Sequence, residues 1–381
     1  MNFNFDQITN RRGTNSLKWD VKQNELPLWV ADMDFKTAPS IQKALEKRVK
    51  HGIYGYSVVP PSWAQSYISW WQKRHNFTIQ SENLIFTTGI VPALSSCIRK
   101  LTSPAEKVLV QTPCYNIFFN SIINNGRIPL ESPLGFDGNK YFIDFDRLEK
   151  DLSDPQVSMM ILCNPQNPTG NLWSFKELEK IGELCKKYGV TVFSDEIHCD
   201  IARPGKQYVP FASVSKTCAE LSVTGIAPTK CFNIAGINTA AVVVQNNFLR
   251  HKVWRALNTD EIAEPNAFAV DATIAAFNEG EEWLSSLNKY LFENRDYATN
   301  FIKQLNANLT PIEADATYLL WVNVNTNGTK FAQELRAKTG LYVAEGSEYG
   351  KAGENFVRIN LACPRKILED AMARLQNFFK N

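Results

Sequence analysis

Short runs of apolar residues alternate with amphipathic stretches from about residue 84 to residue 245. The apolar runs are typical of buried strands, and the stretches between them have the spacing of helices. We predict strands at residues 84–88, 107–112, 157–163, 190–196 and 239–244. Strands that alternate with helices form a mainly parallel sheet covered by helices. The pattern therefore predicts an α/β fold.

The helix expected before the strand at 190–196 has clear ends in the sequence. Ser174 and Glu177 have the spacing of a capping box, and Gly189 follows the last, basic turn. A strand, a helix and a strand therefore follow one another, which places the segments after both strands at one edge of the sheet. Ligands usually bind at that edge.

The pattern changes after about residue 264. Two long amphipathic stretches, 265–280 and 281–305, precede strand-like runs at 318–324 and 356–362. They predict a second, smaller α+β lobe. The first forty or so residues contain few periodic elements, and either pack on this lobe or reach a partner subunit. We expect a large domain at 46–279, and a small domain at 280–381 joined by the N-terminal segment 1–45.

Composition and charge exclude several classes of protein. Hydrophobic residues make up 44% and charged residues 21% of the 381 positions, which argues against disorder. The net charge of +2 is spread along the chain without a basic block, so we expect no nucleic-acid partner. No run approaches the roughly 20 apolar residues of a membrane span, and the start lacks the apolar core of a secretory signal. We expect a soluble, cytoplasmic protein.

The cysteines and histidines do not form a metal signature. Eight cysteines occur singly without a C-x-x-C pair, and the four histidines are dispersed. The prediction is therefore reduced, buried thiols and no metal.

Lys230 is the only charged side chain between Glu220 and Arg250. A lysine in such a segment either extends to the surface or has a lowered pKa, which makes it a neutral amine able to attack carbonyl groups. Taken alone, the first reading is the more common one. The second would make Lys230 a Schiff-base lysine.

Polar residues follow two of the predicted strands. Asp195 and Glu196 are either a solvated turn or a charge directed into a pocket, where a carboxylate could hold a pyridine ring protonated. The segment NPQNPTG, residues 164–170, is a rigid turn, and it would hold Asn167 as a fixed amide donor. The edge of the sheet thus carries both an acid and an amide.

Other candidate groups are weaker when taken singly. Gly89 opens an expected helix whose N-terminus suits a phosphate. Tyr115 and Tyr56 follow secondary-structure elements, although aromatic residues are more often part of a core. Arg358 is an isolated charge in an apolar run; it suits either capture of a carboxylate or a structural ion pair.

Taken together, NPTG, SDEIH, APTK and VRIN resemble fold-type-I pyridoxal 5'-phosphate (PLP) enzymes of the class I/II aminotransferase family. More narrowly, NRRGTNSLKWD, ADMDF, YGYS, TPCYNIFF, NPQNPTG, SDEIHCD, KCFNIAG and RINLACPR resemble the MalY/PatB-type cystathionine β-lyases, or cysteine-S-conjugate β-lyases. The resemblance covers nearly the whole chain. It implies a large PLP-binding domain with a mainly parallel sheet.

The resemblance also implies roles for single residues. Lys230 would form the Schiff base with PLP and act as general base, and Asp195 would pair with the pyridine nitrogen. The remaining expected cofactor contacts are Asn167 and His198 to the ring oxygen, Tyr115 stacked on the ring, and Gly89, Ile90, Val91, Thr229 and Tyr56 to the phosphate. Tyr56 would come from the neighbouring subunit, which implies a homodimer with shared active sites. Arg358 would bind the substrate carboxylate, with Asn167 and Asp32 also in the substrate site.

Two positions depart from the family pattern. Many relatives have a phosphate-binding serine where this chain has Ala227, and an arginine where it has Asn238. Thr229 and Tyr56 could compensate. Asp32 and Asp34 either shape the substrate pocket or serve as turn and capping acids, the second being the more common role of such residues.

The implied reaction is α,β-elimination from a small amino-acid substrate, cystathionine or a related cysteine S-conjugate, to a thiol, pyruvate and ammonia. An aminotransferase is the main alternative, because the same residues serve both reactions. A PLP-binding regulator that acts by protein contact is a third. The preferred leaving group depends on the pocket around the sulfur.

Overall fold

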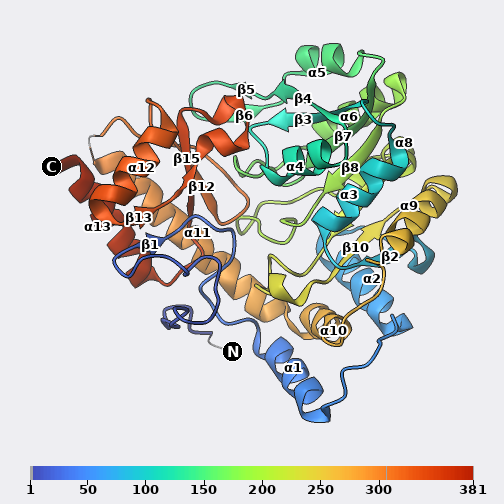
Figure 1. Cartoon of the computed structure of the whole chain (residues 1–381), viewed down its shortest axis with the longest axis horizontal. Helices are drawn as coiled ribbons and strands as arrows, with labels where there is room; N and C mark the ends of the chain where they lie inside the picture. Colours follow the sequence, from blue (N-terminus) through green and yellow to red (C-terminus); the bar gives the residue numbers. More distant parts are fainter. Residues whose placement is uncertain (1–2, 306, 381) are drawn as a thin grey trace.

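A seven-stranded sheet forms the centre of the protein in a computed structural model that describes residues 3–305 and 307–380 (Figure 1). The strand order is β2-β10-β9-β8-β7-β3-β4. All strands run parallel except β10, which is antiparallel to both of its neighbours. The strands are β2 (Leu84–Thr87), β3 (Lys107–Thr112), β4 (Ile128–Pro133), β7 (Val157–Cys163), β8 (Thr191–Asp195), β9 (Ser222–Ile226) and β10 (Ala240–Val243).

Five of these strands are those predicted from the apolar runs, and the mainly parallel sheet is confirmed. The sequence reading missed β4 and β9. Strand β4 contains two prolines and lies at the edge of the sheet, where proline is tolerated. Strand β9 contains Gly225 where α3 (Ile90–Leu101) approaches the backbone: a Cβ there would lie 3.0 Å from Ile90 Cδ1.

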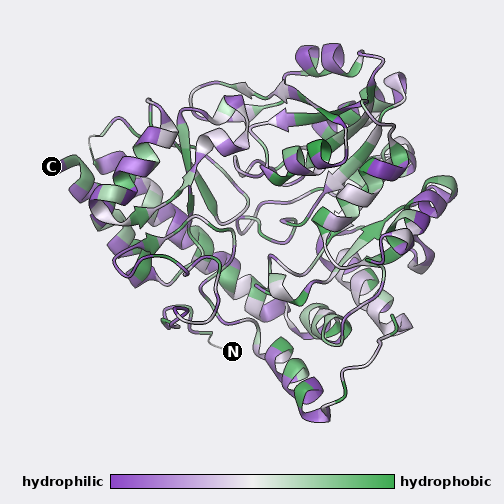
Figure 2. Cartoon of the chain, in the orientation of Figure 1, coloured by the Kyte–Doolittle hydropathy of each residue, from purple (hydrophilic) through white to green (hydrophobic). Residues whose placement is uncertain are grey.

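Both faces of the sheet are buried. Met159, Ile161 and Phe193 pack on one face with α3 and α4 (Ile117–Asn124). Met160, Leu162 and Val192 pack on the other with α6 (Phe175–Tyr188). This alternation explains why β7 and β8 read as continuous apolar runs, which are green in Figure 2.

Helices cover the sheet and extend beyond it (Figure 1). The predicted capping box of Ser174 and Glu177 is present at the start of α6, and Gly189 ends that helix in the left-handed conformation. These helices are α1 (Pro39–His51), α2 (Pro61–His75), α3 (Ile90–Leu101), α4 (Ile117–Asn124), α5 (Phe145–Leu152), α6 (Phe175–Tyr188), α7 (Phe211–Val214), α8 (Lys216–Leu221), α9 (Asn247–Thr259) and α10 (Ala269–Glu279), with short 3-10 turns η1 (Ser81–Asn83) and η2 (Ala235–Ile237).

A second sheet, antiparallel, lies in the C-terminal part with the order β11-β12-β15-β14. The N-terminal segment packs on this part, because β1 pairs with β13 and Asn360 N donates to Leu28 O. The elements of these two segments are β1 (Leu26–Pro27), α11 (Glu281–Gln304), β11 (Thr310–Pro311), β12 (Leu319–Asn323), α12 (Gly328–Thr339), β13 (Leu341–Tyr342), β14 (Ala344–Glu345), η3 (Gly346–Tyr349), η4 (Lys351–Gly353), β15 (Phe356–Asn360) and α13 (Arg365–Lys380). Strands β5 (Gly135–Phe136) and β6 (Tyr141–Phe142) form a separate two-stranded sheet. The domain boundaries at residues 45 and 280 stay a prediction.

Two further findings bear on the sequence predictions. All eight cysteines are buried and free of disulfides, as expected. Among the helices of residues 3–305 and 307–380, none combines the length and the apolar character that a bilayer crossing requires.

Candidate active site

A cavity of about 190 Å³ lies at the carboxyl ends of β7 and β8, beside the start of α3. Nine of the residues predicted from sequence line it: Gly89, Ile90, Val91, Tyr115, Asn167, Asp195, His198, Thr229 and Lys230. Seven further lining residues were not predicted as site residues: Ala31, Thr88, Pro92, Cys163, Ile197, Ala235 and Asn238. Segments far apart in the sequence therefore meet at the expected edge of the sheet.

Lys230 follows β9, and its partly buried side chain lines the cavity. Nζ donates to the carbonyl oxygen of Ala31 at 2.6 Å. Burial, with a smaller contribution from Arg358, lowers the pKa of Lys230 to about 8, although Asp32 and Asp195 act in the opposite direction. Near pH 8 a large share of the lysine is thus a neutral amine, the form that attacks carbonyl groups.

Asp195 is the last residue of β8 and lines the cavity. Its Oδ1 accepts a hydrogen bond from the backbone N–H of Ile197 at 3.1 Å. Burial raises the pKa of Asp195 to about 6, against the Ile197 N–H and the charge of Lys230. At neutral pH the carboxylate is mainly ionised, and a cationic partner in the cavity would stabilise it.

Glu196 has a different role from its neighbour. It does not line the cavity; instead it accepts hydrogen bonds from Ser194 Oγ (2.7 Å), the Phe211 N–H (3.0 Å) and the Tyr208 hydroxyl. Burial raises the pKa of Glu196 to about 7, while these donors lower it. Of the two adjacent acids, Asp195 therefore lines the cavity, whereas Glu196 holds the segment of Tyr208 and Phe211 by hydrogen bonds.

Asn167 and Arg358 meet although 191 positions separate them. Arg358 Nη1 lies 3.3 Å from Asn167 Oδ1, and Nη2 donates to Trp29 O at 2.8 Å. Arg358 Nε is buried without a hydrogen-bond partner among the described residues. The guanidinium also stacks on Tyr349, with Cζ 4.9 Å from the ring centre. Among residues 3–305 and 307–380 no carboxylate lies within ion-pair distance of Arg358, which favours ligand capture over a structural ion pair.

The turn NPQNPTG is held rigidly against the C-terminal part. Gly170 has φ +75°, and a Cβ there would lie 2.5 Å from Ala314 Cβ and 2.8 Å from Ala316 O. Both Asp315 N and Ala316 N donate to the carbonyl of Gly170. Only glycine fits this approach, which fixes the position of Asn167 nearby.

His198 and Tyr115 are uncharged polar groups of the cavity. Burial, together with the charges of Lys230 and Arg358, lowers the pKa of His198 to about 3, so the imidazole is neutral. Its Nδ1 is buried without a partner within the described residues. Burial also raises the pKa of Tyr115, which keeps the phenol protonated. Both residues can exchange hydrogen bonds with a ligand without adding charge.

The start of α3 offers backbone donors to an anion. Gly89 is the N-cap in extended backbone, and no side chain caps the helix. The N–H groups of Ile90 and Val91 in the first turn are thus available, with the positive end of the helix dipole behind them. Thr88, Thr229 and Asn238 add polar side chains at the cavity wall, whereas Ala227 does not reach it.

Three predicted residues do not line this cavity. Arg358 lies beside it, hydrogen-bonded to the lining residue Asn167. Tyr56 is fully exposed on the extended segment between α1 and α2. Asp32 is paired with Arg11, Nη2 to Oδ2 2.6 Å, and its neighbour Asp34 with Arg11 and Lys18 at 2.7 and 2.8 Å. Both acids are therefore members of a partly buried ion cluster, a role other than turn or cap.

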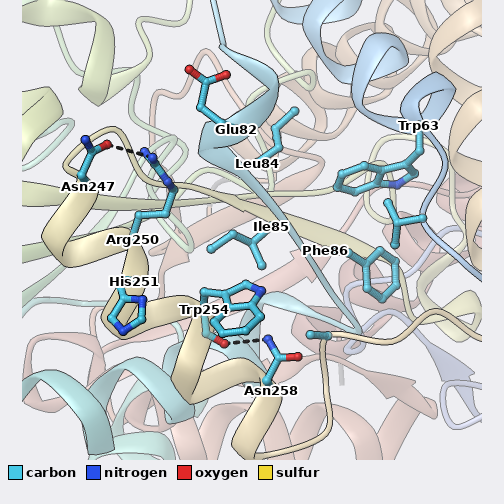
Figure 3. A pocket seen from close by; sticks show the side chains of 12 residues that line it. Trp63, Glu82, Leu84, Ile85, Phe86, Asn247, Arg250, His251, Trp254 and Asn258 are labelled. Carbon is cyan, nitrogen blue, oxygen red and sulfur yellow. Dashed lines mark hydrogen bonds between the residues drawn. The ribbon is translucent and has the colours of Figure 1, made fainter.

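A larger hollow of about 510 Å³ lies elsewhere, beside the edge strand β2 and α9 (Figure 3). Trp63, Phe86 and Trp254 give it aromatic walls, and Arg250 is bonded to Asn247 at 2.8 Å and Asn83 at 2.7 Å. None of the residues predicted for the site lines it. The convergent chemistry lies in the smaller cavity.

A partly buried lysine of lowered pKa and a buried aspartate share a cavity at the carboxyl ends of a seven-stranded, mainly parallel sheet, which is the arrangement of a PLP-dependent enzyme of fold type I. Comparison with known proteins agrees. The family model for aminotransferase class I and II matches residues 23–375. The chain belongs to this family, and the predicted family, fold and cofactor are confirmed.

Individual relatives narrow the comparison. The chain is 40% identical to cystathionine beta-lyase PatB of Bacillus subtilis, over 98% of this chain and 99% of the relative. It is 32% identical to protein MalY of Escherichia coli, over 98% of both chains. The structure of a PLP-bound C-S lyase from Staphylococcus hominis aligns with a TM-score of 0.93 and 31% identity, over 100% of this chain and 99% of that one.

Proposed function

We propose that this protein is a PLP-dependent carbon–sulfur β-lyase that cleaves cystathionine or a related cysteine S-conjugate to a thiol, pyruvate and ammonia. The observation that carries the proposal is that Lys230 and Asp195 line the same cavity, in a chain that aligns with PatB over 98% of its length. Lyases of this kind need an amine, an acid and a carboxylate-binding group around one cofactor. All three are present.

The residues of the cavity fit PLP group by group. Lys230 provides the amine for the aldehyde, and Asp195 the negative charge for the ring nitrogen. Asn167 and the neutral His198 face the same space and suit the ring oxygen, while Tyr115 suits the face of the ring. The uncapped first turn of α3 suits the phosphate. The site thus offers a matching partner for each part of the cofactor.

Arg358 would bind the α-carboxylate of the substrate. Its position is fixed by Trp29 O, Asn167 Oδ1 and the ring of Tyr349. Its buried Nε–H has no partner within the described residues, so a carboxylate can accept it without displacing a protein acceptor. The substrate would then be held with its Cα toward Lys230.

Lys230 is suited to move the proton at Cα. Its lowered pKa gives a share of neutral amine near physiological pH, as a general base requires. When bound, PLP supplies an electron sink for the pair that the proton leaves behind. Asp195 holds the negative charge that keeps this sink cationic. The bond from Cβ to sulfur then breaks, the thiolate leaves, and hydrolysis of the remaining fragment yields pyruvate and ammonia.

The exposed segment between α1 and α2 supports a homodimer. Ile53, Tyr54, Tyr56 and Val58 are apolar or aromatic and more than half exposed. Such a patch on an extended segment is typical of a protein–protein contact. In the proposed dimer, Tyr56 reaches the phosphate site of the partner subunit, and Asn238 and Thr229 complete that site where Ala227 provides no hydroxyl. The protein would be cytoplasmic.

Pyruvate formation from cystathionine in the absence of any keto acid tests the lyase activity directly. The rival reaction, transamination, shares the binding groups and the lysine base but requires a keto acid and leaves the cofactor in its amine form. If pyruvate appears only after a keto acid is added, the protein is an aminotransferase. A regulator would show little turnover and would retain a partner protein on purification.

A further inference from the structure

Five consecutive backbone carbonyls of residues 29–33 point to side chains at or beside the cavity. Trp29 O accepts from Arg358 (2.8 Å), and Val30 O from Asn360 (2.5 Å). Ala31 O accepts from Lys230 at 2.6 Å. Met33 O accepts from Asn233 and from Arg11, both at 3.0 Å. Since the donors come from both the first and the second half of the chain, this segment joins the two around the cavity.

Asn360 determines the position of the middle of this segment. Its Nδ2 donates to Val30 O at 2.5 Å and to Asp32 O at 2.6 Å, on either side of Ala31. Its Oδ1 accepts the Ala362 N–H at 2.8 Å, so the orientation of the amide is determined. The side chain is fully buried on β15.

Ala31 O, held between these two bonds, faces two donors. Lys230 Nζ lies at 2.6 Å and the Tyr318 hydroxyl at 2.9 Å. At the far end of the segment, Asp34 is fixed by Lys18 at 2.8 Å and Arg11 at 2.7 Å, with Lys18 fully buried. The carbonyl is therefore anchored from both sides and cannot follow a movement of the lysine.

We propose that Asn360 is a positioning residue for Lys230: by holding the carbonyls of Val30 and Asp32 it presents Ala31 O as the fixed acceptor of the lysine amine whenever that amine is not joined to the cofactor. This inference rests on the proposed function, because it assigns Lys230 the role of base. It concerns a residue outside the cavity that acts through a backbone carbonyl.

The chemical benefit follows from the geometry of an amine. A neutral amine has two N–H bonds and one lone pair. When one N–H is fixed on Ala31 O, rotation about the last carbon–nitrogen bond is restricted, and the lone pair is directed to one side. Once the amine has taken a proton, the same carbonyl receives a charge-assisted hydrogen bond. A fixed acceptor thus both orients the base and stabilises its charged form.

The test replaces the amide by a side chain of similar size that cannot donate, Asn360→Leu. Asn294 offers a matched control, because this fully buried amide also holds two carbonyls, Leu361 O at 3.0 Å and Cys363 O at 2.9 Å, and within the described residues none of its hydrogen bonds goes to residues 29–35. Asn294→Leu should therefore lose similar stability. Asn360→Ser, which keeps one donor, provides a milder variant should Asn360→Leu fail to fold.

The measurement is the pKa of the Lys230 amine in the full chain freed of cofactor, from the pH dependence of its acetylation followed by mass spectrometry. The charged groups around the amine, Arg358, Asp32 and Asp195, all remain. We expect Asn360→Leu to lower this pKa by about one unit, the equivalent of one hydrogen bond to a charged group, and Asn360→Ser by less. Asn294→Leu should leave it unchanged.

A second measurement uses the cofactor-loaded enzyme. At saturating substrate we expect kcat of Asn360→Leu to fall by about tenfold to a hundredfold, and kcat of Asn294→Leu to stay near the native value. An unchanged lysine pKa in both Asn360 variants, with stability losses equal to those of the Asn294 control, would overturn the inference. That outcome is independent of whether pyruvate is formed, since the acetylation assay needs no substrate.

Discussion

Asp195 and Glu196 are neighbours in the chain, yet only Asp195 lines the cavity that contains Lys230. Glu196 instead accepts hydrogen bonds from Ser194, Tyr208 and Phe211. Adjacent residues at the end of a strand point in different directions, so the pair serves chemistry and architecture separately. Substitutions at the two positions should have opposite consequences.

Asp195→Asn should abolish most activity but stabilise the cofactor-free protein. A carboxylate about 4 Å from a cationic ring contributes roughly 4 kcal/mol at an effective dielectric near 20, and the isosteric amide removes it. We expect kcat to fall by about a hundredfold or more, with PLP still bound through Lys230. Steady-state kinetics and the absorbance spectrum of the loaded variant check this.

The stability effect of Asp195→Asn depends on pH. Burial raises the pKa of the folded carboxyl from 3.8 to about 6, so the folded state holds the proton more tightly than the unfolded state. The protonated Asp195 side chain contributes fully to the stability of the native protein below pH 4. This contribution is lost as the pH rises through 6, a difference of roughly 3 kcal/mol. Denaturant unfolding of cofactor-free protein should show the variant more stable at pH 8 and equal at pH 4. Equal stability of the native protein and the variant at both pH values would contradict a destabilising buried charge at Asp195.

Glu196→Ala should lower the free energy of unfolding by about 2–4 kcal/mol, since four donors, on Ser194, Tyr208, Phe211 and Asn164, lose an acceptor. The measurement is urea unfolding of the loaded enzyme. The folded fraction should retain activity within a few-fold of the native value. A large loss of kcat without a loss of stability would place Glu196 in the chemistry after all.

Lys230→Ala should remove the visible absorbance of the bound cofactor and reduce turnover by at least about a thousandfold, because the covalent link and the base are lost together. Lys206→Ala is the control: that lysine is exposed and pairs with Asp315 at 3.1 Å. It should keep both spectrum and rate. Spectroscopy and pyruvate assays on the two variants check this.

Arg358→Lys should raise KM more than it lowers kcat. A lysine keeps the charge but lacks the planar guanidinium group, and with it the Nε–H that has no hydrogen-bond partner within the described residues. We expect KM to rise by about tenfold to a hundredfold. An amine that lacks the carboxylate provides a control: its turnover should be the same in both proteins.

Shared active sites can be tested by mixing two inactive variants. Tyr56→Ala subunits keep Lys230, and Lys230→Ala subunits keep Tyr56. In a mixed dimer one of the two sites contains both native residues, so random exchange should restore about a quarter of the native activity. The assay is pyruvate formation before and after subunit exchange. If no activity returns although mixed dimers form, Tyr56 acts within its own subunit or not at all.

Much of the fold could be predicted because local patterns determine it. The apolar runs of β7 and β8 and the capping box at Ser174 are local signals, and they place Asn167 and Asp195 at one edge of the sheet. The single charge at Lys230 is another such signal. Local patterns do not give strand direction, and for this reason the antiparallel course of β10 was not predicted.

The remaining parts of the site depend on contacts between distant segments. Ala31 contributes a backbone oxygen, which no side-chain pattern reveals, and Tyr318 reaches it from a position 287 residues away. Asn360 belonged to a recognised motif, but its partners at 30 and 32 lie 330 and 328 residues earlier. The charged residues in NRR, LKW and ADMDF could be seen in the sequence. Their assembly into one ion cluster of Arg11, Lys18 and Asp34 could not be predicted from it.

The bond from Arg358 to Trp29 O spans 329 residues, nearly the length of the chain. During synthesis this bond can form only after β15 has left the ribosome, while the central sheet can already assemble from its own neighbours. The position of Arg358 beside the cavity is thus set at the final stage of chain synthesis. A chain stalled before β15 would contain every residue that lines the cavity but neither Arg358 nor Asn360.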